Sequence, residues 1–208
     1  MASLTGIPPS GRLAFKALRN KSPIGTHHLT FAREGDALTV NIAVDFLVKI
    51  GFIPVFRYKL RCVESWQGGV LISVRAKTDN NGTADWMRAD LDGDALLVEG
   101  SKVEGSRAEG SKAARYRAPV GAIIASHWNQ AQLDAPMINP QDGSLLRYAV
   151  APRGPARIVD STGKIRATHR FALTGANPLD LWYDADGLWT ALQAKAADGS
   201  TIGYQLIG

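Results

Sequence analysis

Three ionisable side chains stand in stretches where apolar and polar residues alternate: Glu64, His27 and His169. Such alternation indicates a strand with one buried face, and each of the three falls on the apolar face. Interior ionisable groups collect where ligands bind, and a carboxylate beside an imidazole can act as general acid and base. We therefore consider Glu64, His27 and His169 candidate catalytic residues, with the Tyr58 hydroxyl as the donor that would steady an oxyanion.

Glu64 also has a purely structural interpretation. It lies between Cys62 and Trp66 on the apolar face, where a carboxylate is costly unless it is paired or hydrogen-bonded. An ion pair in the wall of the fold would satisfy it, and each histidine could equally be a hydrogen-bonded core residue. The inward partners that the sequence offers are Arg88, His27, His169, Tyr58 and Tyr204. A His–His–Glu set could hold a metal ion, but nothing places the three on adjacent strands, so we predict no metal site and no cofactor.

Two aromatic clusters, at 126–129 and 181–184, contain large side chains that the fold must bury. These rings either plug the ends of the fold or line the mouth of a pocket for an apolar ligand. On the second interpretation, the candidate ligand-binding residues are Phe56, Trp66, Trp128, Trp182 and Tyr183.

Short turn signals divide the chain into many strands. Asx-Gly pairs recur between alternating apolar runs, which is the strongest local signal for hairpins. Roughly eleven to thirteen antiparallel strands must curl or close to protect their edges. The predicted fold is therefore all-β, an antiparallel meander closed or half-closed into a barrel. The predicted elements are strands at 12–19, 23–33, 37–48 and 52–66, a final hairpin of 188–196 with 201–207, and one short helix at 119–133.

The chain of 208 residues is expected to form a single β-barrel-like domain, 1–208. Residues 99–113 repeat a Glu-Gly-Ser pattern that has no apolar face. Such a segment cannot offset its ordering entropy by burial, so we expect a flexible loop. A mobile lid over the barrel mouth is the alternative.

Several function classes are excluded by missing motifs. The sequence has no Walker or Rossmann glycine loop, no His-Glu-x-x-His and no Gly-x-Ser-x-Gly, and its single cysteine, Cys62, rules out a disulfide framework. The net charge is +5, but the basic residues alternate along strand faces. We therefore expect no nucleic-acid partner. No run of apolar residues is long enough for a transmembrane helix, so we expect no stable membrane insertion.

The order of several motifs resembles a family of proteobacterial proteins of about this length, a domain of unknown function. The chain departs from the family at His127 and in the 99–113 repeat. The resemblance implies an all-β, barrel-like, periplasmic protein, distantly similar to periplasmic half-barrels that carry lipids, and it assigns no catalytic residue. The motifs are those at 23–31, 56–58, 64–69, 78–82, 126–129 and 178–187.

Two functional hypotheses remain open. The first is a barrel that binds a small hydrophobic molecule in its interior. The second is a cofactor-independent isomerase, cyclase, lyase or hydrolase that uses an inward Glu/His pair. A scaffold without a ligand is a third, weaker hypothesis. The opening residues lack a basic segment followed by an apolar one, so the expected periplasmic location supposes a removed signal peptide, with a cytoplasmic location as the alternative. The sequence does not define the oligomeric state.

Overall fold

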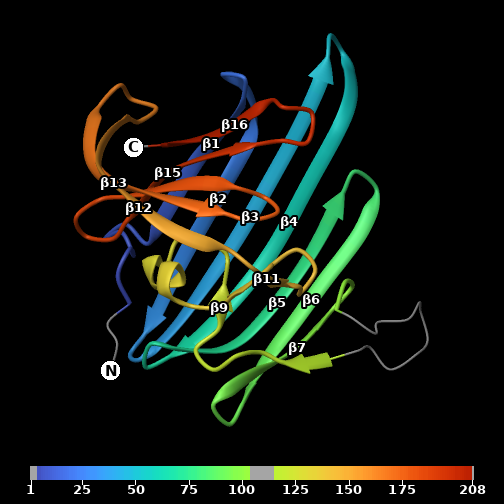
Figure 1. Ribbon diagram of the computed structural model, residues 1–208, viewed down its shortest axis with the longest axis vertical. Helices are drawn as coiled ribbons and strands as arrows, with labels where there is room; N and C mark the ends of the chain where they lie inside the picture. The colour runs from blue at the N-terminus through green and yellow to red at the C-terminus, as the bar shows by residue number, and fades with distance from the viewer. Residues whose placement is uncertain (1–3, 104–114, 208) are drawn as a thin grey trace.

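A computed structural model describes residues 4–103 and 115–207, and nearly all its regular structure is β (Figure 1). The alternating segments form long strands joined by tight turns, as their pattern predicts. The bounds are β1 Arg12–Arg19, β2 Ser22–Glu34, β3 Ala37–Ile50, β4 Ile53–Gln67, β5 Val70–Asn80, β6 Thr83–Asp92, β7 Ala95–Gly100, β8 Arg115–Arg117, β9 Ile123–Ile124, β10 Met137–Ile138, β11 Leu145–Leu146, β12 Ala149–Val159, β13 Ile165–Thr174, β14 Leu179–Tyr183, β15 Trp189–Lys195 and β16 Thr201–Leu206.

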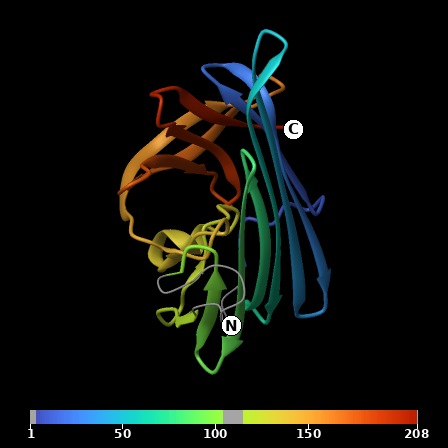
Figure 2. The ribbon, with the colours of Figure 1, turned by 90° about the vertical axis from the view of Figure 1, so that its right-hand side faces the viewer.

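One large antiparallel sheet contains thirteen of these strands. Its order is β12-β13-β14-β15-β16-β1-β2-β3-β4-β5-β6-β7-β8, so the first and last thirds of the chain join through β1 and β16. The sheet curls strongly, but β8 and β12 remain as separate edges, and Figure 2 shows the open side. The all-β, half-closed barrel predicted from the sequence is confirmed.

The segment 118–148 lies on the concave side of this half-barrel (Figure 2). It contains a small sheet of order β11-β10-β9 and one 3₁₀ helix, η1 at Gln130–Asp134. The predicted helix at 119–133 is therefore wrong over most of its length. The cause is tertiary: the amides of Ile123 and Ala125 donate to the carbonyls of Pro136 and Ile138, at 3.0 and 2.9 Å, instead of to a helical turn.

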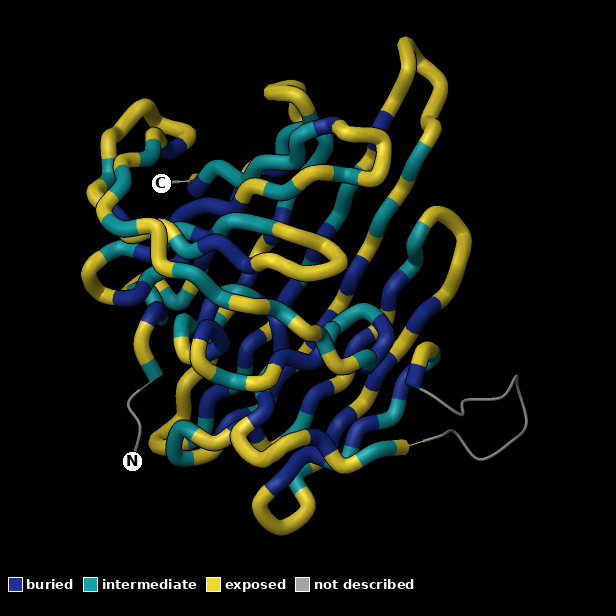
Figure 3. Tube along the Cα trace, viewed as in Figure 1, coloured by how far each residue is buried: buried dark blue, intermediate teal, exposed yellow. Residues whose placement is uncertain are grey.

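The buried residues form one core between the sheet and segment 118–148 (Figure 3). Along β3 the inward positions Leu38, Val40, Ile42 and Val44 are at most 5% exposed, which matches the predicted alternation. The alternation predicted for 52–66 is wrong at its start, since Phe52 is 99% exposed. Of the 99–113 repeat, residues 104–113 lie outside the described residues. No helix within the described ranges is long and apolar enough to span a bilayer.

Candidate functional site

Two adjoining cavities lie inside the half-barrel. The inner cavity has a volume of about 240 Å³ and the outer one about 810 Å³. They share Tyr58, Leu179 and Tyr204 as lining residues, so β4, β14 and β16 provide a wall common to both. The polar residues that complete the inner cavity are His27, Ser126, His127, Asn139, Tyr148 and Asn177.

His27 is one of the polar residues that line the inner cavity. Strand β2 places it on the inward face, where it is 5% exposed, while the following His28 points outward to solvent. Neither ring nitrogen of His27 has a hydrogen-bond partner among the described residues. Burial, together with the nearby His127 and His28, lowers the pKa of His27 from 6.5 to about 3. The ring is thus neutral at physiological pH and presents one unused donor and one unused acceptor.

A second neutral imidazole, His127, faces the same cavity from segment 118–148. Its φ of +71° lies in the left-handed region, which is unfavourable for a non-glycine residue and recurs at ligand sites. The Tyr183 hydroxyl donates to the His127 carbonyl at 2.8 Å and accepts from Gln132 Nε2 at 2.6 Å. These two hydrogen bonds stabilise the backbone conformation of His127. Burial lowers the pKa of His127 to about 4, only partly offset by Gln132.

Aromatic rings enclose the two imidazoles. His27 meets Trp189 and Tyr204 edge to face, with ring centroids 5.3 and 5.5 Å apart. His127 also meets Trp189, at 5.4 Å. Burial raises the pKa of both Tyr58 and Tyr204 well above 10, so their hydroxyls stay protonated and can donate. The inner cavity therefore combines aromatic and aliphatic walls with neutral hydrogen-bonding groups.

The outer cavity is mainly apolar. Phe56 and Phe46 line it together with Val48, Val55 and Ile202, so the structure places one of the predicted ligand-binding residues, Phe56, at this cavity. Arg19 and Asp198, which also line it, form an ion pair with each other. This cavity can hold a hydrocarbon or aromatic body, whereas the inner cavity offers hydrogen bonds.

Glu64 points inward, as predicted, but it does not join this constellation. Its Oε2 accepts hydrogen bonds from the indoles of Trp66 and Trp128, both at 3.0 Å, and the residue is fully buried. Burial raises the pKa of its carboxyl group, opposed by Ser126 and the two indoles. Neither cavity has Glu64, Trp66 or Trp128 among its lining residues. The predicted partner Arg88 pairs instead with Glu99 at 2.7 Å on the outer face.

His169 and Trp182 lie outside both cavities. The His169 side chain is exposed, so the expectation that it is buried is wrong. Trp182 is half-buried with the Arg170 guanidinium 5.4 Å from its ring centroid, a cation–π contact that faces away from the core. Its neighbour Tyr183 is fully buried but supports His127 and does not line a cavity. The structure therefore separates the aromatic candidates into one cavity residue, Phe56, and structural residues.

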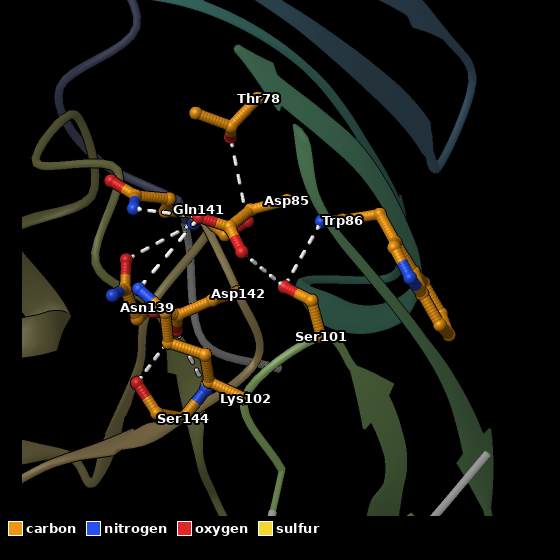
Figure 4. Close-up of polar contacts among 9 residues, drawn as sticks. All are labelled: Thr78, Asp85, Trp86, Ser101, Lys102, Asn139, Gln141, Asp142 and Ser144. Carbon is orange, nitrogen blue, oxygen red and sulfur yellow. Dashed lines mark hydrogen bonds and ion pairs between the residues drawn. The ribbon is translucent and has the colours of Figure 1, made fainter. Parts of the chain in front are cut away.

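A polar cluster holds the loop at 139–144 against the sheet (Figure 4). Asp85 on β6 accepts a hydrogen bond from Gln141 Nε2 at 3.2 Å, and Lys102 Nζ lies 3.7 Å from Asp85 and 3.5 Å from Asp142. Gln141 reaches the outer cavity from this loop, and Asn139 reaches the inner one. The cluster thus positions part of the site.

Sequence reasoning missed the roles of His127 and Tyr148, and it offered the inward Tyr204 only as a partner for Glu64. Tyr204 alternates with Ile202 and Leu206 on β16 and lines both cavities instead. His127 and Tyr148 come from segment 118–148, whose irregular backbone has no period to indicate direction. Among the described residues, no group of three or more His, Cys, Asp or Glu side chains could hold a metal ion.

Comparison with known proteins supports the fold and the family. None of the curated proteins matches this sequence. A crystal structure of a beta-barrel-like protein of domain of unknown function DUF1849, from Brucella abortus, superposes with a TM-score of 0.65 over 99% of this chain and 98% of that chain. At 9% identity this likeness shows the fold alone. Residues 15–207 match a family described as a domain of unknown function, and the chain belongs to this family, DUF6134.

Proposed function

We propose that this protein binds a small, mainly apolar molecule that carries one uncharged polar end. The observation that carries the proposal is the pair of adjoining cavities, one mainly apolar and one lined by His27, whose two ring nitrogens have no partner among the described residues. Buried polar groups in native proteins nearly always find a hydrogen-bond partner, so two free nitrogens in one cavity favour a ligand that supplies the missing bonds. The apolar body occupies the outer cavity, and the polar end reaches His27.

The inner cavity favours a hydroxyl or carbonyl group over an ion. No Asp, Glu, Lys or Arg is among the described residues that line it, and both imidazoles are neutral at pH 7. A carboxylate taken into such a site would lose its hydration without gaining a cation, which is strongly unfavourable. A neutral imidazole, in contrast, can donate to a carbonyl oxygen or accept from a hydroxyl.

The same observations favour binding over catalysis by an inward Glu/His pair. Glu64 contacts two indoles and lines neither cavity, so it does not meet His27 there. Imidazoles with a pKa of about 3 or 4 are weak bases at neutral pH, and general bases work best with a pKa near the working pH. The outer cavity, at about 810 Å³, lies in the range usual for sites that enclose small molecules, and the inner one adds about 240 Å³.

The proposal is tested with dodecan-1-ol and dodecanoate, two probes that share a chain and differ in the charge of the head. Isothermal titration calorimetry of the purified protein is expected to show tighter binding of dodecan-1-ol than of dodecanoate. His27→Leu should weaken binding of the alcohol about tenfold, the loss of one good hydrogen bond. His28→Leu, a change of the outward neighbour, is the matched control and should leave affinity unchanged.

Native mass spectrometry of protein purified from its own cells provides a second readout, a retained ligand. Tighter binding of dodecanoate than of dodecan-1-ol would contradict the proposal that the polar end of the ligand is uncharged. Equal losses in His27→Leu and His28→Leu would contradict the assignment of His27. A protein that binds neither probe and retains no ligand would overturn the proposed function.

A further inference from the structure

The longest hairpin of the sheet projects beyond its neighbours. Pairing between β2 and β3 ends at Gly25 opposite Phe46, and pairing between β4 and β5 ends at Tyr58 opposite Asn80. Residues 47–57, here called the β3–β4 ribbon, therefore form ladder pairs only with each other, and the Arg57 carbonyl at the base of the ribbon also accepts a hydrogen bond from the Asn81 amide at 2.8 Å. Figure 1 shows this ribbon rising above the rest of the molecule at the top of the view.

The end of the β3–β4 ribbon is strongly apolar and exposed to solvent. Phe52 is 99% exposed, and Ile50 and Ile53 are 70% and 69% exposed. Leu47 and Val55 follow at 40% and 44%. A ribbon of two strands gains nothing from apolar side chains that touch only water, and clustered exposed apolar residues mark interaction sites. The ribbon thus has the composition of a contact surface.

Positive charge accompanies this apolar tip. The stretch 46–59 contains Lys49, Arg57 and Lys59 and no acidic residue. Arg57 lies 3.2 Å from Asp79, and Lys59 has Asp45 and Asp79 as its cross-strand neighbours, whereas Lys49 forms no ion pair with any residue that the structure describes. An apolar tip with an unpaired lysine behind it is complementary to a bilayer with anionic headgroups, because the rings and methyl groups can enter the acyl boundary while the ammonium group stays at the phosphates.

We infer that the β3–β4 ribbon is a peripheral docking element for a lipid bilayer with anionic headgroups. Phe52, Ile50 and Ile53 enter the interface, and Lys49 contacts the headgroups. The docking does not require the proposed ligand. Docking nevertheless bears on the proposed ligand, because Val48, Val55 and Phe56, at the base of the ribbon, line the outer cavity. If both inferences hold, docking brings the apolar cavity next to the lipid.

Flotation of the protein with vesicles tests the docking. Vesicles of phosphatidylcholine and phosphatidylglycerol in equal parts should bind the protein, and pure phosphatidylcholine vesicles should bind it more weakly. The double variant F52S/I53S should reduce partitioning at least tenfold, because it removes most of the apolar surface that enters the bilayer. V159S/I165S, which changes an exposed apolar pair in the β12–β13 hairpin, is the matched control and should bind like wild type.

The charge contribution has its own variant. K49Q should lower partitioning to the mixed vesicles by about fivefold. Raising the salt concentration from about 0.1 M to about 1 M should likewise lower the partitioning of wild type. K16Q, which removes an exposed lysine from another strand, should have a smaller effect. All substituted side chains are exposed, so these variants are expected to fold.

Three results would overturn the inference. Wild type could fail to bind the mixed vesicles, or F52S/I53S could bind them as well as V159S/I165S does. Analytical ultracentrifugation could instead show a dimer that F52S/I53S dissociates, which would make the ribbon an interface between two copies. Because none of these readouts uses dodecan-1-ol, failure of the docking and failure of the proposed ligand site are distinguishable.

Discussion

The indole of Trp128 donates a hydrogen bond to the fully buried carboxyl group of Glu64 at 3.0 Å, which fastens segment 118–148 to strand β4. Trp66 donates to the same oxygen, and the two indole rings meet edge to face with centroids 5.5 Å apart. Glu64 thereby fixes the segment that carries His127. Its contribution to the site is the position of that segment.

Replacing Glu64 by leucine should destabilise the protein by about 3 kcal/mol, because two buried indole N–H groups lose their acceptor. Glu64→Gln retains an acceptor oxygen and removes the cost of ionising a buried acid whose pKa is raised. It should therefore stay within about 1 kcal/mol of wild type, or exceed it, at neutral pH. Urea unfolding followed by tryptophan fluorescence measures both. A glutamine variant as unstable as the leucine variant would show that the charge itself is needed.

Much of the sheet was predictable because period-two alternation and Asx-Gly turns are local signals. The predicted strand at 12–19 coincides with β1, and those at 23–33 and 37–48 differ from β2 and β3 by one or two residues at their ends. The alternation also placed His27 and Glu64 on the inward face. Local pattern specifies which face of a strand a side chain occupies, and here that was sufficient.

Alternation does not specify whether anything covers a face. His169 pairs across strands with the buried Tyr183, yet its own side chain is exposed. Phe52, just before β4, continues the alternation of that strand, but it is exposed because the β3–β4 ribbon extends beyond the neighbouring strands there. The site itself depends on segment 118–148 folding back against the sheet. This long-range contact brings His127 to His27 and has no local signature in the sequence.

The buried neutral His27 should make the protein sensitive to acid. Its pKa is about 3 in the folded protein and 6.5 in the unfolded chain, so the unfolded chain binds the proton first as the pH falls. Stability is then fully present above about pH 6.5 and declines toward about pH 3, with about 2 kcal/mol lost between about pH 7 and pH 5. Between these two pH values, the free energy of unfolding of His27→Leu should fall by about 2 kcal/mol less than that of wild type. The free energy of unfolding of His28→Leu should fall as much as that of wild type. Urea titrations at both pH values measure the difference, and identical pH dependence in the two variants would contradict a buried neutral ring.

The loop at 139–144 approaches β7 so closely that Gly100 cannot carry a side chain. A Cβ there would lie 2.1 Å from the Asp142 carbonyl oxygen, far inside contact distance. Gly100→Ala must displace the loop and loosen the cluster around Asp85, so we expect a fall in melting temperature and weaker binding of dodecan-1-ol. Gly203→Ala is the control, since its Cβ would meet nothing closer than 3.9 Å. Equal melting temperatures for the two variants would show that the loop is not packed as described.

The Tyr183 hydroxyl should be needed to hold His127 in its left-handed conformation. Tyr183→Phe removes the donor to the His127 carbonyl and leaves the Gln132 amide without its acceptor in a buried position. Each unsatisfied buried group costs about 1–3 kcal/mol, so the free energy of unfolding should fall by about 2 kcal/mol or more. Thr168→Val breaks a buried hydroxyl hydrogen bond, 3.2 Å to the Ala156 carbonyl in the β12–β13 hairpin away from both cavities, and serves as the control for stability alone.

Ligand binding then separates support of the site from general stability. Release of the left-handed backbone at His127 should turn its ring away from the inner cavity, since the strained conformation persists only while its surroundings impose it. Tyr183→Phe should therefore weaken binding of dodecan-1-ol more than Thr168→Val does, even when both variants are measured well below their melting temperatures. Equal affinities in the two variants would mean that His127 keeps its place without Tyr183, and that the chain of hydrogen bonds from Gln132 stabilises the fold without shaping the site.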